Sequence, residues 1–247
     1  MNPTLGNDDA ILTGIKKHLS NLSHICNHVL DREKFFERYL ALYAHPSSIL
    51  IDSMDAWSRG QITSKIWLIN QCLELELKLG RTWILCGWIG TLSYLMLERR
   101  DLLAISTVRS FDIDKSCTAL ADELNRFDVK DSWRFKATTI DVNSLIYTDF
   151  TYETLRYDGS IQPLYESADT IVNTSCDHMG SNNAWWDNIP IGTITVLQNN
   201  DWSDNDQHNN TVSSIDEFKN NYPMTELLYA GELDCTLYTR YMLIGRK

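Results

Sequence analysis

The chain has 247 residues, of which 43% are hydrophobic and 22% are charged. This composition excludes a disordered protein, and the length suits one α/β domain with an N-terminal addition. The formal net charge is −11, and residues 158–247 carry 4 Lys or Arg against 13 Asp or Glu. Because such a surface repels phosphate groups, the charge disfavours nucleic acid as a partner without excluding it.

The N-terminal sequence MNPTLGNDDA lacks the basic and apolar regions of a secretory signal. The longest apolar run, residues 83–97, is short for a membrane-spanning helix and contains two glycines. Six cysteines are scattered without a CxxC pair, which is typical of reduced thiols in a chain of this size. We therefore expect a cytoplasmic protein with no membrane span and no structural zinc site.

Residues 8 to about 80 show the apolar spacing of helices. We expect three helices: one from residue 8 with Asn7 or Asp8 as cap, one that Asp31 caps and Pro46 stops, and one over residues 64–79 that Gly80 ends. We assign residues 1–80 as an N-terminal helical region that covers a pocket in a second unit, residues 81–247.

From residue 81 the pattern changes to short apolar strands that alternate with helices. Seven strands are expected, at residues 82–86, 107–112, 133–139, 168–173, 192–198, 226–231 and 238–245. The alternation predicts an α/β fold, a three-layer sandwich around a mainly parallel sheet. Because the last two strands leave almost no room for a helix between them, we expect an antiparallel hairpin at the sheet edge. The Asn- and Asp-rich residues 199–210 are expected to form a loop.

Four predicted strands are followed by residues suited to an adenosyl ligand, at the edge where parallel sheets bind ligands. Gly87 and Gly90 let the backbone approach a ligand at a helix N-terminus. Asp112 lies 22 residues after Gly90, near the ~20-residue spacing of a ribose-binding carboxylate. Asp141 is placed to accept a hydrogen bond from an adenine amino group. Asn173 is expected to lie near the reactive centre. The alternatives are a tight turn at the glycines, and helix caps or a solvated turn at the aspartates.

The segment Val108-Arg-Ser-Phe-Asp-Ile-Asp-Lys115 resembles the second-strand signature of class I, Rossmann-like S-adenosylmethionine-dependent methyltransferases. The resemblance covers about residues 80–247 and includes the antiparallel last strand pair. It implies S-adenosylmethionine as cofactor, with Asp112 on the ribose and Asp141 near the adenine. The predicted cofactor contacts are Gly87, Trp88, Gly90, Asp112, Ile113, Asp141, Val142 and Asn173.

The first loop departs from the family pattern. It reads Cys86-Gly-Trp-Ile-Gly90, whereas the family usually shows an acidic residue followed by glycines at alternating positions. The loop is somewhat closer to those of enzymes that use S-adenosylmethionine for other transfers, such as the nicotianamine-synthase-like group. Aminocarboxypropyl transfer is therefore the alternative to methyl transfer. A nicotinamide-dependent enzyme and a non-catalytic binding protein on the same fold are further alternatives.

The segment Asn173-Thr-Ser-Cys-Asp-His178 is the densest polar cluster in the chain and directly follows a buried strand. The predicted catalytic residues are His178 as general base, Asp177 to orient it, and Asn173 to hold an acceptor amide or hydroxyl. A turn with a structural histidine is the alternative. Trp185 and Trp186 either stack on a planar or cationic acceptor or belong to the core.

The predicted partner is a small or medium-sized acceptor that takes the methyl group by in-line displacement. Asp55, Trp57 and Arg59 are candidates for the surface that selects it, with simple packing as the alternative. No metal is predicted, because no short ligand spacing supports convergence of Asp177, His178 and His208 on a cation. Nothing in the sequence selects an oligomeric state.

Overall fold

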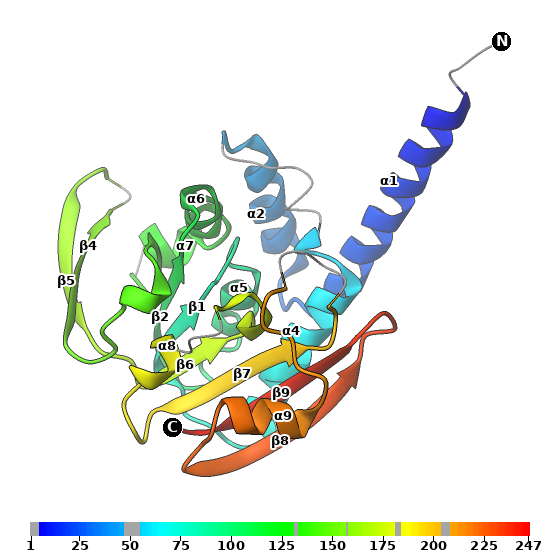
Figure 1. Ribbon diagram of the computed structural model, residues 1–247. Helices are drawn as coiled ribbons and strands as arrows, with labels where there is room; N and C mark the ends of the chain where they lie inside the picture. The colour runs from blue at the N-terminus through cyan, green and yellow to red at the C-terminus, as the bar shows by residue number, and fades with distance from the viewer. Residues whose placement is uncertain (1–4, 47–54, 131–132, 157, 181–183, 204–207) are drawn as a thin grey trace.

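The computed structural model describes residues 5–46, 55–130, 133–156, 158–180, 184–203 and 208–247. A seven-stranded sheet with the order β3-β2-β1-β6-β7-β9-β8 forms its centre (Figure 1). Strand β9 runs antiparallel to both of its neighbours, β7 and β8, and the other neighbouring strands of this sheet pair in parallel. The predicted sheet and its antiparallel last pair are confirmed, with β8 at the edge. The strands are β1 Gly80–Leu85, β2 Ile105–Asp112, β3 Phe135–Thr139, β6 Thr170–Asn173, β7 Ile194–Asn200, β8 Glu226–Asp234 and β9 Thr239–Arg246.

Each face of the sheet has its own apolar core. Along β1, Trp83 and Leu85 belong to one core and Ile84 to the other, because successive side chains of a strand point to opposite faces. Large apolar side chains on both faces require cover on both sides, which confirms the three-layer sandwich. One layer contains α4 Arg59–Glu74, α5 Thr91–Leu97 and α6 Lys115–Leu124, followed by α7 Arg126–Lys130; the other contains α8 Ala184–Asp187 and α9 Ile215–Asn221.

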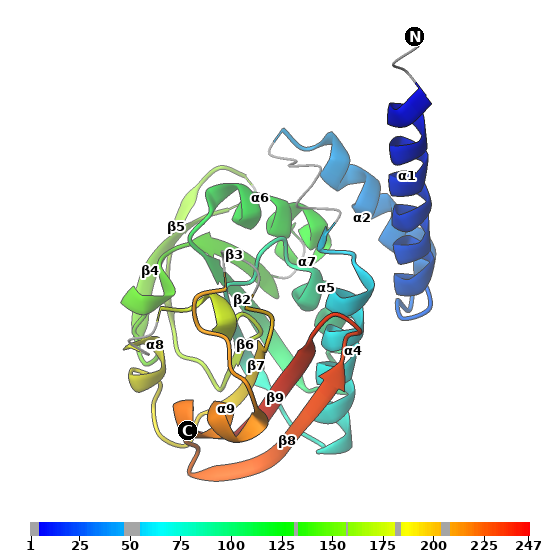
Figure 2. The ribbon, with the colours of Figure 1, turned by 45° about the vertical axis from the view of Figure 1, so that its right-hand side comes forward.

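The N-terminal helices α1 Leu5–Ile25 and α2 Arg32–Ala44 precede α4. Figures 1 and 2 show α1 directed away from the sheet, with its first turn farthest from it. Asp31 caps α2 as predicted, since its carboxylate accepts from the backbone N–H of Lys34 at 3.0 Å. No helix of the described segments is long and apolar enough to cross a membrane.

Several predicted boundaries are wrong. Asn7 and Asp8 lie inside α1, so neither precedes it as a cap. The helix expected over residues 64–79 is α4, which begins earlier because Ser58 caps it by accepting from the backbone N–H of Gln61. Gly80 does not end that helix but begins β1 with a φ of +58°, and a Cβ there would lie 2.5 Å from a carboxylate oxygen of Asp169.

The loop predicted over residues 199–210 begins later than expected. Asn199 and Asn200 are buried and belong to β7, because their backbones continue the ladder with β9. Residues 204–207 of this segment lie outside the described residues.

The N-terminal helical region and the sheet share one of the two cores. Trp57 is fully buried, with its ring edge-on to Phe35 and Tyr39, and the same cluster continues to Ile84 and Val172 of the sheet. Trp57 is therefore a core residue, and its predicted place on an acceptor-selecting surface is wrong. The division of the chain at residue 80 stays a prediction.

A two-stranded antiparallel hairpin, β4 Phe150–Leu155 and β5 Ile161–Glu166, lies between β3 and β6 and was not predicted. It is fixed to the sheet by the buried guanidinium of Arg109 on β2, which donates to both carboxylate oxygens of Glu166 at 2.7 and 2.8 Å. The hydroxyl of Tyr152 also donates to Glu166, at 3.0 Å.

Candidate active site

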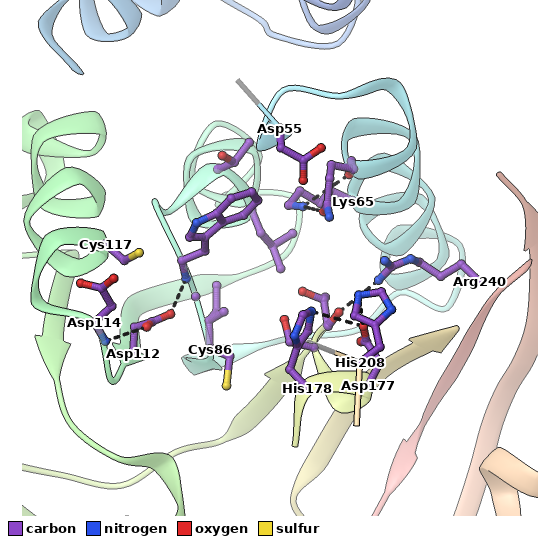
Figure 3. Close-up of a pocket in the computed structure, with 18 of the residues that line it drawn as sticks. Asp55, Lys65, Cys86, Asp112, Asp114, Cys117, Asp177, His178, His208 and Arg240 are labelled. Carbon is purple, nitrogen blue, oxygen red and sulfur yellow. Dashed lines mark hydrogen bonds and ion pairs between the residues drawn. The ribbon is translucent and has the colours of Figure 1, made fainter. Parts of the chain in front are cut away.

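A cavity of about 510 Å³ lies beyond the carboxyl ends of β1, β2 and β6 (Figure 3). The loop after β1, the end of β2 and the turn after β6 form its base, and α4 and the β8–β9 hairpin contribute to its other walls. Parallel sheets bind ligands at this edge, and the volume is in the range of small-molecule sites. The structure therefore places one ligand-sized site where the sequence predicted it.

Asp112 is held rigidly at the cavity. Its Oδ2 accepts a hydrogen bond from the backbone N–H of Trp88 at 2.9 Å, and its Oδ1 accepts from that of Asp114 at 3.0 Å. Burial raises the pKa of Asp112 above its ordinary value, although these two hydrogen bonds act in the opposite direction. Since a carboxylate has about four lone-pair sites, each oxygen can accept a further hydrogen bond from a ligand.

The loop after β1 has an unusual backbone. Cys86 and Trp88 adopt positive φ angles of 51° and 50°, which cost free energy in residues with side chains and concentrate at functional sites. Gly90 caps α5 with a φ of +77°, and a Cβ there would lie 2.8 Å from the Asn125 amide nitrogen and 3.0 Å from Ala121 Cβ. A glycine at this position thus lets α5 and α6 approach each other.

Gly87 packs directly against β2, where a Cβ would lie 1.9 Å from the Oγ of Ser110. We expect Gly87→Ala to lower the free energy of unfolding by about 1–3 kcal/mol, the usual cost of overpacking. Urea denaturation of the variant measures this loss. The double variant Gly87→Ala/Ser110→Ala should recover most of it, since the colliding Oγ is gone, and an equal loss in both variants would contradict this explanation.

Some of the other predicted cofactor contacts line the cavity, and others lie outside its wall. Gly87, Trp88 and Ile113 line the cavity with Asp112. Asp141 and Val142 do not line it: the Asp141 carboxylate caps a short 3₁₀ helix by accepting from the Asn143 backbone N–H at 2.9 Å, and Val142 is buried in the core. A contact of Asp141 and Val142 with an adenine stays a prediction.

Asn173, the last residue of β6, is fully buried and does not line the cavity. Its Oδ1 accepts from the backbone N–H of Ser175 at 2.9 Å, and its Nδ2 has no hydrogen-bond partner within the described ranges of the chain. The following residues, Thr174 and Ser175, do line the cavity. Asn173 therefore shapes the turn, and its contact with a substrate or cofactor stays a prediction.

Two buried cationic side chains line the cavity on the α4 and β9 side. Lys65 of α4 donates to Gln61 Oε1 at 2.6 Å, and burial together with the charge of Arg240 lowers the pKa of Lys65 to about 7. Arg240 of β9 donates from Nη1 to the carbonyl of Thr174 at 3.1 Å, and its Nε has no hydrogen-bond partner in the described part of the chain. Asp55 also lines the cavity, as predicted, whereas Arg59 is exposed and does not.

Asp177 lies between two histidines at the opposite end of the cavity from Asp112 (Figure 3). Its Oδ2 is 3.3 Å from Nε2 of His178 and 3.2 Å from Nε2 of His208. The expected contact between Asp177 and His178 is present, and His208 joins them from a distant part of the chain. Whether His178 acts as a base stays a prediction.

Trp185 and Trp186 do not reach the cavity. Both are buried in the second core, where their rings pack against Tyr222 at centroid distances of 5.5 Å. The prediction that they stack on an acceptor is wrong, and their alternative as core residues is correct. The aromatic side chains that line the cavity are instead Trp88, Trp202 and Tyr238.

Comparison with solved structures agrees with this architecture. The N-methyltransferase NodS from Bradyrhizobium japonicum, in complex with S-adenosylhomocysteine, is 10% identical with a TM-score of 0.54, and the match covers 87% of this chain and 98% of that one. Magnesium protoporphyrin IX methyltransferase from Synechocystis, with bound S-adenosylmethionine, is 13% identical with a TM-score of 0.50, and the match covers 86% and 90%. The chain has the fold of class I S-adenosylmethionine-dependent methyltransferases. No protein-family model and no curated protein sequence matches it.

Within this methyltransferase fold, sequence reasoning found the residues that directly follow strands and missed those that reach the cavity from elsewhere. Lys65, Trp202, Tyr238 and Arg240 line the cavity but were not predicted. The one available signal was at Lys65, a lysine at the helical spacing of the apolar residues Ile62 and Ile69, which are both buried.

Proposed function

We propose that the protein transfers a methyl group from S-adenosylmethionine to a small or medium-sized acceptor. The observation that carries the proposal is the Asp112 carboxylate, which ends β2, lines the cavity and is oriented through both oxygens by backbone N–H groups. The two solved methyltransferases of the same fold, one with bound S-adenosylmethionine and one with S-adenosylhomocysteine, support the same cofactor and the same reaction class.

The residues present fit an adenosyl cofactor. Asp112 would accept hydrogen bonds from the two ribose hydroxyls with the lone pairs that Trp88 and Asp114 leave unused. Ile113, whose side chain is exposed, offers an apolar surface for the flat adenine ring beside the ribose. The backbone of Gly87 and Trp88 would then face the methionine end. When bound, this cofactor supplies an electrophilic methyl group on a sulfonium.

The acceptor is proposed to lie at the other end of the cavity. Figure 3 shows Asp112 and Asp114 on one side, and Asp177, His178 and His208 on the other, with Cys86 between them. Burial raises the pKa of Cys86 to about 12, so its thiol stays protonated and is not a nucleophile at neutral pH. In catalysis, this chain would align the acceptor with the methyl group, keep water out of the space between them and help to remove a proton from the acceptor.

Isothermal titration calorimetry with S-adenosylmethionine and S-adenosylhomocysteine tests the proposal, with micromolar affinity expected for both. A thermal-shift comparison with NAD separates it from a nicotinamide-dependent enzyme. Incubation with a small-molecule extract should yield S-adenosylhomocysteine, whereas methylthioadenosine would indicate aminocarboxypropyl transfer. Absence of binding to either adenosyl compound would contradict the proposal, and binding without turnover would indicate a non-catalytic protein.

A further inference from the structure

Three side chains of types that commonly bind metal ions lie close together, at the end of the cavity proposed for the acceptor. Asp177 and His178 belong to the 3₁₀ helix η2 Cys176–His178, and His208 comes from the segment after β7. The two segments are joined by the backbone N–H of Asn210, which donates to the Asp177 carbonyl at 2.9 Å, and by the Asn210 amide, which donates to the Cys176 carbonyl at 3.3 Å. The three side chains are therefore fixed by the fold.

The hydrogen bond between His208 and Trp202 indicates which ring nitrogen of His208 carries the hydrogen. Its Nδ1 lies 2.8 Å from the carbonyl oxygen of Trp202, which can only accept a hydrogen bond, so Nδ1 carries the hydrogen. In the neutral ring, Nε2 then presents a lone pair, and this lone pair faces the Asp177 carboxylate at 3.2 Å. Two acceptors at this distance repel each other unless a proton or a cation lies between them.

The carboxylate of Asp177 also has too few hydrogen-bond donors around it among the described residues. Its Oδ2 also faces Nε2 of His178 at 3.3 Å, and its buried Oδ1 has no hydrogen-bond partner among the residues that the structure describes. Asp177 is only 2% exposed, so water does not compensate this negative charge fully. Arg240 acts on it electrostatically, but the ion pairs of Asp177 within the described part of the chain are those with the two histidines.

The two distances from Asp177 to the histidine nitrogens match those in a metal centre, and the three ligand atoms all lie within 4.8 Å of one another. Two ligand atoms bound at about 2.0–2.1 Å in a tetrahedral site lie about 3.4 Å apart. The observed separations of 3.2 and 3.3 Å are close to this value. A backbone carbonyl that accepts from the remote nitrogen of a ligating histidine, as Trp202 does for His208, is the usual second contact in such centres.

We propose that Asp177, His178 and His208 bind a divalent transition-metal cation, with open coordination positions directed into the cavity. Two imidazoles and one carboxylate suit Zn²⁺, Fe²⁺ or Co²⁺ better than Mg²⁺ or Ca²⁺. The cation would bind a hydroxyl oxygen of the acceptor, a role that rests on the proposed function. The hydroxyl proton leaves to water, the oxygen bonds to the methyl carbon, and the carbon–sulfur bond breaks with its electron pair on sulfur.

Calorimetry of the chelator-treated protein with Zn²⁺ alone, and visible absorption with Co²⁺, test cation binding without any acceptor. One equivalent is expected to bind with micromolar or tighter affinity. His178→Gln, at a half-exposed ligand that the fold tolerates losing, should weaken binding at least 100-fold, and Asp177→Asn should do the same. His28→Gln removes a histidine outside the cavity and should leave cation binding unchanged.

Substitutions at the proposed cation site and at the proposed cofactor site should each affect the binding of only one ligand. His178→Gln should retain S-adenosylhomocysteine binding, and Asp112→Ala should retain the Co²⁺ spectrum while losing S-adenosylhomocysteine. Catechol, used as an oxygen-donor probe, should shift the Co²⁺ bands of the wild type and not those of His178→Gln. Binding of S-adenosylhomocysteine without any cation binding, a proton-only contact, would overturn the inference and leave the proposed function intact. A bound cation with no response to catechol would overturn its role in holding the acceptor.

Discussion

Replacing Asp112 by alanine is expected to weaken binding of S-adenosylhomocysteine at least 100-fold in calorimetry. The substitution removes two charge-assisted hydrogen bonds to the ribose, each worth about 1.5–3 kcal/mol, and 3 kcal/mol is a factor of about 150 in affinity. It also leaves the backbone N–H groups of Trp88 and Asp114 without their acceptor. Both loops that border the ribose position would therefore lose their fixed geometry.

Two further variants make this test specific. Asp112→Asn should be nearly as damaging, because both carboxylate oxygens accept from backbone N–H groups and an amide NH₂ cannot. Asp169→Ala removes a carboxylate at the other end of the strands, just before β6, where Asp169 pairs with Arg81 at 2.8 Å. This variant should leave the affinity for S-adenosylhomocysteine unchanged. Retained binding in Asp112→Ala, or an equal loss in Asp169→Ala, would refute the assignment of Asp112 to the ribose.

The sheet could be predicted because its strands carry strong local signals. Trp83, Ile84 and Leu85 form a continuous apolar run, and both faces of that run are buried. The β4–β5 hairpin has no such signal. Its strand β5 alternates between exposed and half-buried residues, and its attachment depends on the contact between Arg109 and Glu166, which are 57 positions apart. Contacts of this kind leave no trace in a local pattern.

The same distinction between local signals and distant contacts explains which residues of the site could be predicted. Asp112 was identified from its place after a predicted strand and its spacing from Gly90, since the carboxyl ends of neighbouring parallel strands lie together. His208 was considered as a ligand and set aside, since 30 residues separate it from His178. The fold closes that separation through Asn210. Asp141 is the reverse case: it follows a strand as predicted, its carboxylate caps a 3₁₀ helix outside the cavity wall, and its contact with an adenine stays a prediction.

The second large effect is expected at Lys65, whose replacement by methionine should stabilise the protein at neutral pH. Burial and the charge of Arg240 lower the pKa of Lys65 to about 7 in the folded state, whereas its ordinary value is 10.5. Between these two values the unfolded state binds more protons, so the stability of the wild type rises with pH over this window. At pH 7 and below, the lysine thus costs the fold on the order of 3–5 kcal/mol.

Urea denaturation of the chelator-treated proteins at pH 7, 8 and 9 measures this contribution. The gain in free energy of unfolding for Lys65→Met over wild type should be largest at pH 7 and should fall by up to about 1.4 kcal/mol per pH unit. Lys78→Met is the matched control, because Lys78 is exposed and its charge remains hydrated in the folded state. A gain that is the same at pH 7 and pH 9 would show that Lys65 does not titrate in this window. If the gain falls with pH as expected, the cavity gives a reason for a destabilising lysine beside Arg240: together, Lys65 and Arg240 would offer positive charge to an anionic group of a bound molecule.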